Sequence, residues 1–189
     1  MIGRRARPGL LALALLTSCA SRPPWADGRI VYEPASTHPV PQDLARFEDR
    51  ILALHNRERA RIGAPPLSWD PALAAAAAGY GPALSRLGKL AHSDYSTRRG
   101  QGENLFMGTR GAYSVEEMIG GWADEKSLFR PGIFPKVSRS GHGGDVGHYT
   151  QMIWRSTTSM GCALHSDAKW DFLICRYSPP GNVLKHQVP

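Results

Sequence analysis

The spacing of apolar residues changes along this chain, from helical spacing over its first two thirds to short strand-like runs near the C-terminus. Apolar residues first recur at three- and four-residue intervals at Phe47, Ile51 and Leu54, which is the spacing of one helix face. Two compact apolar stretches, residues 161–164 and 172–175, are typical of strands. Helical patterns followed by a hairpin indicate an α+β fold and weigh against a series of alternating strands and helices.

Local end signals divide the helical part into three helices. Asp70, followed by a proline, is typical of an N-cap, and Ser114 with Glu117 forms a capping box. The glycine-rich segment 131–147 has little apolar pattern, so we expect a flexible loop there. The three expected helices cover approximately residues 43–62, 70–87 and 114–128.

The N-terminus has the three-part layout of a secretory signal. Arginines at positions 4, 5 and 7 precede an apolar run, residues 10–16, that is too short to span a bilayer as a helix. Leu16-Thr17-Ser18-Cys19 then resembles the bacterial lipobox, in which the peptidase cleaves before the cysteine once its thiol carries lipid. We therefore expect a signal peptide at residues 1–18 and lipidation of Cys19. The alternative is an ordinary signal peptide cleaved near Ala20.

A proline-rich stretch separates this leader from the patterned part of the chain. Residues 20–41 hold five prolines and little periodic apolar pattern, which is typical of an extended tether. We expect a signal peptide at 1–18, a lipidated cysteine and tether at 19–42, and one domain at 43–189. Such a protein is exported and lipid-anchored to the outer or cell-surface membrane; without the lipid it is periplasmic or secreted.

The charge of the exported part argues against nucleic-acid binding. The whole chain carries a net charge of +7, and residues 1–18 contain three Arg and no acid, so +4 remains over 171 residues. The densest basic cluster, Arg57, Arg59 and Arg61, is interleaved with Glu58 on a helix whose other side is apolar. We expect a solvated face there, rather than the concentrated basic surface of a nucleic-acid-binding module.

Two cysteines, Cys162 and Cys175, remain in the domain if Cys19 carries lipid. In a hairpin centred on Ala168 and Lys169 they face each other, so a cross-strand disulfide is geometrically reasonable. An oxidising compartment outside the cytoplasm would favour that bond. The alternative is a pair of buried free thiols.

Two histidines and two glutamates occupy positions where a core does not need them. Glu125 lies three residues after Trp122, at the edge of the apolar stripe of the third helix. The other three residues are His92, Glu103 and His148. Imidazole nitrogen and carboxylate oxygen are ligands that zinc accepts. Spacing does not establish a site, so a surface glutamate and structural histidines are the alternative.

Seven short motifs follow one another between residues 44 and 183, nearly the whole expected domain. They are Leu54-His55-Asn56 with Arg59, Pro66-Leu67-Ser68-Trp69-Asp70, His92-Ser93, Gly102-Glu103-Asn104-Leu105, Trp122 with Glu125, Gly147-His148-Tyr149-Thr150-Gln151-Met152-Ile153-Trp154 and Phe172-Leu173-Ile174-Cys175-Arg176-Tyr177-Ser178-Pro179-Pro180-Gly181-Asn182. In this order they resemble the CAP superfamily, which comprises cysteine-rich secretory proteins, antigen 5 and plant pathogenesis-related 1 proteins.

The resemblance implies a three-layer α/β/α sandwich with a central antiparallel sheet, in which His148 to Gln151 opens a short helix. It also implies a cavity tetrad of His92, Glu103, Glu125 and His148, which binds a divalent metal in some members. The chain lacks the cysteine-rich C-terminal extension of animal venom and sperm members, so their channel-directed roles are not implied. It has two domain cysteines where plant members have six.

Two functions are open at this point. In the first, a non-catalytic module binds a lipid, glycan or protein, and its cavity holds one divalent ion, with zinc expected, on His92 and His148. Glu103 and Glu125 then reach the ion through water or orient the imidazoles. In the second, a metal-dependent hydrolase uses Glu103 or Glu125 as general base, although the chain has no HExxH helix.

Several narrower alternatives accompany these functions. A metal-free cavity is the rival of the metal site, since each histidine can compensate one buried glutamate. His142 and Asp145 are possible further ligands, although the two glycines between them favour a mobile, unliganded loop. A nucleophilic Ser93 activated by His92 is disfavoured, because adjacent residues rarely point at each other. His55, Asn56 and Arg59 are interpreted as structural residues of the first helix.

Overall fold

The computed structural model describes residues 44, 46–98 and 100–189. The expected signal peptide, Cys19 and the proline-rich tether lie outside the described residues. Within them, no helix combines the length and the apolar character that crossing a lipid bilayer requires.

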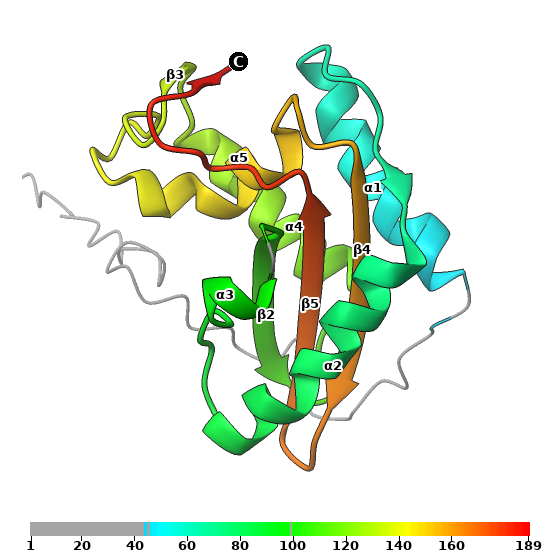
Figure 1. Cartoon of the computed structure of the whole chain (residues 1–189). Coiled ribbons are helices and arrows are strands. Elements are labelled where there is room, and N and C mark those ends of the chain that lie inside the picture. The colour runs from blue at the N-terminus through cyan, green and yellow to red at the C-terminus, as the bar shows by residue number, and fades with distance from the viewer. Residues whose placement is uncertain (1–43, 45, 99) are drawn as a thin grey trace, which may run out of the picture. The chain divides into compact units, whose positions relative to one another are not determined.

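A four-stranded sheet lies at the centre of the domain (Figure 1). Its strand order is β1-β4-β5-β2, and the three long strands are antiparallel neighbours, whereas the two-residue β1 runs parallel to β4. The strands are β1 (Ser68–Trp69), β2 (Gly102–Thr109), β4 (Ser159–Ser166) and β5 (Trp170–Ser178). A second, small sheet pairs β3 (Gly132–Ile133) with β6 (Gln187–Val188).

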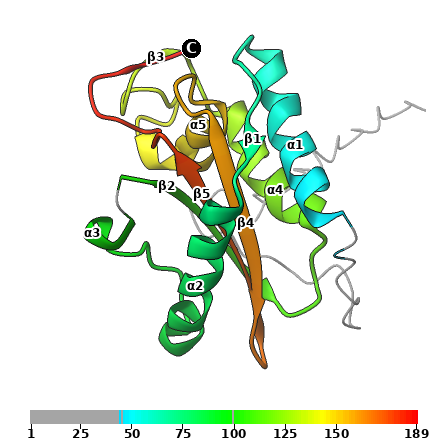
Figure 2. The same cartoon turned by 45° about the vertical axis from the view of Figure 1, so that its right-hand side comes forward.

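Helices cover both faces of the central sheet (Figures 1 and 2). One face carries α2 (Pro71–Leu87), which packs on β4 and β5. The other carries α1 (Phe47–Arg61), α4 (Val115–Asp124) and α5 (Gly147–Ile153), which contact one another. This arrangement confirms the predicted α+β, three-layer sandwich and the short helix expected at His148. The remaining helical pieces are α3 (Tyr95–Arg98) and the short 3₁₀ helices η2 (Glu125–Ser127) and η3 (Gly143–Val146).

The second helix begins where the sequence predicts and lies very close to β4. The carboxylate of Asp70 accepts the backbone N–H of Ala72 at 2.8 Å, which confirms the predicted N-cap. A Cβ atom at Gly161 would lie 2.3 Å from the backbone nitrogen of Ala74, so only glycine lets the two backbones approach this closely. The apolar core on this face consists of Ala77, Leu84, Leu105, Phe172 and Ile174.

The C-terminal hairpin has the predicted register. Ser166 pairs with Asp171, which centres the turn between residues 168 and 169. Cys162 therefore lies opposite Cys175, and their sulfur atoms are bonded at 2.00 Å. The predicted disulfide is confirmed, and the alternative of free thiols is excluded in this structure.

The first helix buries polar side chains beside its predicted apolar stripe. Of that stripe, Ile51 is fully buried and Phe47 and Leu54 are partly buried. His55, Glu58 and Arg59 are fully buried as well. The expectation of a solvated basic face is right for Arg57 and Arg61 and wrong for Arg59. Apolar periodicity missed this face because the groups that satisfy its polar atoms come from distant parts of the chain.

The glycine-rich segment 131–147 is not the free loop that its composition suggests. Its strand β3 pairs with β6, and the N–H of Phe134 donates to the carbonyl of His186 at 2.9 Å. Val137, within the same segment, is fully buried. The β6 partners of this segment lie some fifty residues away in the sequence, so the local composition does not indicate them.

Candidate functional site

His92 and Glu103 form the first of two histidine–glutamate pairs. Nδ1 of His92 lies 2.7 Å from Oε1 of Glu103, and the His92 ring is 59% exposed whereas the Glu103 side chain is fully buried. His92 lies in the connection between α2 and α3, and Glu103 lies on β2. The pair thus joins a solvent-facing imidazole to a carboxylate within the domain.

The carboxylate of Glu103 is held by donors on both oxygens. Ser93 donates its backbone N–H to Oε1 at 3.0 Å and its hydroxyl to Oε2 at 3.1 Å. The guanidinium of Arg176, from β5, lies 3.1 Å from Oε2. Burial alone raises the pKa of Glu103, but the bond from His92, the charge of Arg176 and the Ser93 N–H outweigh it and lower the pKa.

His148 and Glu125 form the second pair. Nδ1 of His148 lies 2.6 Å from Oε1 of Glu125, and the backbone N–H of Tyr149 donates to Oε2 at 2.9 Å. Glu125 stands where α4 changes into η2, so the helix end turns the side chain toward α5. The indole of Trp122 stacks on the His148 ring, with centroids 5.6 Å apart and planes at 11°. The His148 imidazole is therefore held at its edge by Glu125 and on its face by Trp122.

Both pairs lie beside β2, the outermost long strand of the sheet. Glu103 on this strand contacts Arg176, and the next residue, Asn104, points to the opposite face. The Asn104 amide donates to the carbonyl of His148 at 3.1 Å and so ties α5 to β2. Because β2 is an edge strand in the described sheet, groups from both faces can approach one another around it.

The hydrogen bonding of the two imidazoles is the kind that metal-binding histidines have. Each ring uses Nδ1 for its glutamate, and no described residue bonds to Nε2 of His92 or His148. A carboxylate on one ring nitrogen, with the other nitrogen free, is how proteins orient metal-binding histidines. No group of three or more His, Cys, Asp or Glu side chains in the described part of the chain is placed to hold an ion jointly.

Comparison with known families decides the ancestry of this domain. The model of the cysteine-rich secretory protein (CAP) family matches residues 52–177. This chain belongs to the CAP family. It is 36% identical over 138 residues to pathogenesis-related protein PR-1 of Medicago truncatula, with 72% of this chain and 75% of that protein covered. It is 33% identical over 177 residues to pathogenesis-related leaf protein 4 of Solanum lycopersicum, with 92% and 95% covered.

Solved structures support the CAP fold. The crystal structure of NaASP2 with Zn2+ superposes with a TM-score of 0.64 at 22% sequence identity, covering 81% of this chain and 88% of that protein. At this identity the likeness establishes the shared fold of the two CAP proteins.

The CAP motif residues of α1 have the structural positions that the resemblance implies. Nδ1 of His55 donates to the carbonyl of Ile51, so the lone pair of Nε2 accepts the hydroxyl of Tyr177 at 2.9 Å. Burial, together with the charge of Arg59, lowers the pKa of His55 to about 4 despite the bond to Ile51. His55 is therefore neutral in the folded CAP domain at neutral pH.

The side-chain amide of Asn56 forms two hydrogen bonds with the backbone of Leu67: its nitrogen donates to the Leu67 carbonyl, and its oxygen accepts the Leu67 N–H.

Sequence reasoning missed two charged residues near these sites. Arg176 lies within the last CAP motif, but only the fold brings its guanidinium to Glu103 and over the ring of Tyr80, 5.6 Å away. Buried Glu58 is surrounded by three cations, with the nearest, Lys126, at 3.4 Å. The contacts Arg176–Glu103 and Lys126–Glu58 have no sequence signal, because the partners are remote along the chain; Arg57 and Arg61 are sequence neighbours of Glu58.

His142 and Asp145, the possible further ligands, do not join the two pairs. The carboxylate of Asp145 accepts the hydroxyl of Ser140 at 2.6 Å, within its own loop. His142 is exposed and precedes η3.

Proposed function

We propose that this chain is an exported CAP-domain protein whose cavity binds one divalent ion and which acts by binding a ligand rather than by catalysis. The pairing of His92 and His148 with glutamates through Nδ1 carries this proposal, because Nε2 of each ring is left for a metal. Zinc is the expected ion, since it accepts imidazole nitrogen and completes its shell with water. When bound, the ion supplies a positive centre for an oxygen atom of the ligand.

The state of the glutamates favours binding over hydrolysis. A general base needs an oxygen that can take a proton from water. Both oxygens of Glu103 already accept hydrogen bonds from His92, Ser93 and Arg176, and its pKa is lowered. Both oxygens of Glu125 are likewise occupied, by His148 and the N–H of Tyr149. These contacts suit carboxylates that orient imidazoles.

Removal of one imidazole tests the metal site. In calorimetric titrations with zinc at neutral pH, His148→Ala is expected to weaken binding at least about tenfold, because one ligand is lost. His186→Ala is the matched control, because the His186 side chain is exposed and its imidazole bonds, among the described residues, only to the backbone carbonyl of Leu184. Zinc affinity of the wild type should fall as the pH is lowered, since protonated imidazole cannot ligate.

Two results would contradict the metal site. One is the absence of heat in the wild type at neutral pH, and the other is equal zinc affinity in the wild type and His148→Ala. Either result leaves a metal-free polar cavity in which each histidine compensates one glutamate.

The lipobox-like sequence ending at Cys19 supports a membrane anchor for the exported domain. Acyl chains stabilise membrane attachment by about 0.8 kcal/mol per buried methylene, so two or more chains hold a protein firmly. Cys19→Ser is expected to release the protein into the soluble fraction or to block its processing, as fractionation and intact mass would report. A mutant that still matures normally and sediments with membranes would refute the anchor.

A further inference from the structure

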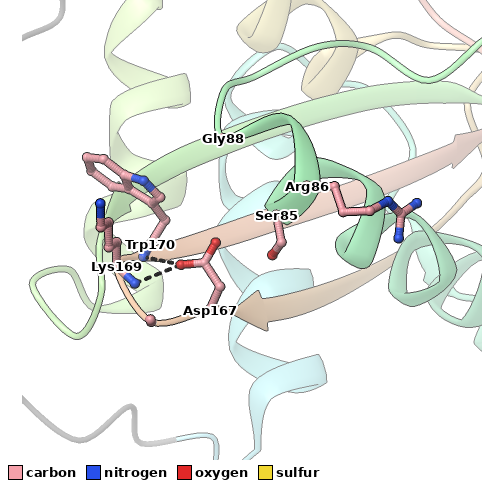
Figure 3. Close-up of a pocket in the computed structure, with 7 residues that line it drawn as sticks. Ser85, Arg86, Gly88, Asp167, Lys169 and Trp170 are labelled. Carbon is pink, nitrogen blue, oxygen red and sulfur yellow. Dashed lines mark hydrogen bonds between the residues drawn. The ribbon is translucent and has the colours of Figure 1, made fainter.

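A separate pocket lies at the end of α2, on the β4–β5 turn (Figure 3). It has a volume of about 570 Å³, within the size range of small-molecule sites. None of the histidine–glutamate pairs belongs to it. The residues that line it are Ser85, Arg86, Gly88, Asp167, Ala168, Lys169 and Trp170.

One wall of the pocket is the indole of Trp170. This side chain is half-buried because its other side packs on the apolar core under α2. The ring therefore has a fixed position and presents apolar surface to the pocket. The negative face of an aromatic ring attracts the weakly positive C–H groups of a flat partner, and the C–H face of a pyranose ring is such a partner.

Hydrogen-bond acceptors lie beside the indole. Oδ1 of Asp167 accepts the backbone N–H groups of Lys169 and Trp170 at 2.7 and 2.8 Å, and in Figure 3 the carboxylate lies between Trp170 and Ser85. The Ser85 side chain also contacts this carboxylate, and each carboxylate oxygen can accept a second donor. The last carbonyls of a helix also lack intrahelical donors, and α2 ends at Leu87, next to the lining residue Gly88. A ligand rich in hydroxyl groups matches these acceptors.

The charge of the pocket is positive. Neither Arg86 nor Lys169 has a carboxylate partner among the described residues, and both side chains are exposed. Asp167 is the single acid in the lining, and backbone N–H groups already hold it. Figure 3 shows the Lys169 side chain beside the Trp170 ring and the Arg86 side chain on the α2 side. An anionic group beside the Trp170 ring would pair with Lys169, while Arg86, whose side chain extends away from Trp170 in Figure 3, adds to the positive potential.

We propose that this pocket binds an acidic saccharide, whose sugar ring stacks on Trp170, whose hydroxyl groups donate to Asp167 and whose carboxylate pairs with Lys169. The site is independent of the proposed metal cavity, because the two share no residue. It gives the CAP domain a glycan specificity set by one aromatic ring and the cation beside it.

Calorimetry on the full chain with defined oligosaccharides tests the proposal. Hexagalacturonate is expected to bind, and the neutral hexasaccharide cellohexaose to bind at least about tenfold more weakly, which corresponds to about 1.4 kcal/mol. Lys169→Glu should lower hexagalacturonate affinity by a similar factor without disturbing the fold, because Lys169 is exposed in a turn. Trp170→Leu should also weaken binding, with circular dichroism as the check that it folds.

Lys136→Glu is the matched control, since it places the same charge change on an exposed residue next to β3, outside the pocket. It should leave hexagalacturonate affinity unchanged, as should His148→Ala. Retained binding in His148→Ala separates this proposal from the metal site. The proposal is overturned by no heat with hexagalacturonate, by equal affinity for cellohexaose, or by equal losses in Lys136→Glu and Lys169→Glu.

Discussion

Arg59→Ala is expected to lower the free energy of unfolding by about 4 kcal/mol, because it removes a buried charge that satisfies several backbone carbonyls. The fully buried guanidinium donates to the carbonyls of Pro65 at 2.6 Å, Trp154 at 2.8 Å and Thr157 at 2.9 Å, and also to that of Met152. Burial and the charge of Arg155 lower the pKa of Arg59 to about 10, so it stays protonated at neutral pH. Without it, these carbonyls lose their donors and a cavity opens.

Urea unfolding of Arg59→Ala beside Arg57→Ala measures this effect. Arg57 lies on the same helix but is exposed, and it forms an ion pair with Glu58 at 3.5 Å. Glu58 keeps Arg61 and Lys126 as partners, and water screens the exposed guanidinium of Arg57, so Arg57→Ala should cost about 1 kcal/mol or less. Similar losses in the two variants would show that charge on α1, rather than the buried hydrogen bonds, controls stability.

Removal of the disulfide by the double substitution Cys162→Ala, Cys175→Ala should lower the free energy of unfolding by about 3 kcal/mol in the chain-entropy model. The bond closes a loop with a sequence separation of 13 residues between β4 and β5. The hairpin itself should persist, because β5 also pairs with β2 along its length. The loss therefore reports mainly on the freedom gained by the unfolded chain.

Unfolding in urea, with and without a reductant, separates the sources of this effect. The wild type with reductant and the double mutant without reductant should unfold at similar urea concentrations. The wild type without reductant, which keeps its disulfide, should unfold at a higher concentration. Since both cysteines are fully or nearly fully buried, the double mutant also loses some packing. A double mutant as stable as the oxidised wild type would contradict the predicted contribution of the bond.

The sequence by itself determined those features whose causes are local or periodic. Asp70 and Ser114 cap helices because their side chains reach backbone N–H groups two or three residues ahead. The hairpin register followed from two apolar runs around a polar turn, and this register placed Cys162 opposite Cys175. The ordered CAP motifs identified the family, the sandwich and the short helix at His148, which periodicity alone does not indicate.

Only the tertiary structure decided which polar groups meet. Arg59 belongs to a run of alternating charges that resembles a solvated face, yet its hydrogen-bond acceptors lie up to 98 residues away. The sequence around β3 is typical of a loop, but in the fold β6, near the C-terminus, pairs with β3. The fold likewise fixed the use of Nδ1 by His92 and His148 and the contact of Arg176 with Glu103. Apolar patterns record burial, because burial requires only the absence of water; a hydrogen bond or ion pair requires one particular partner, and the fold alone supplies it.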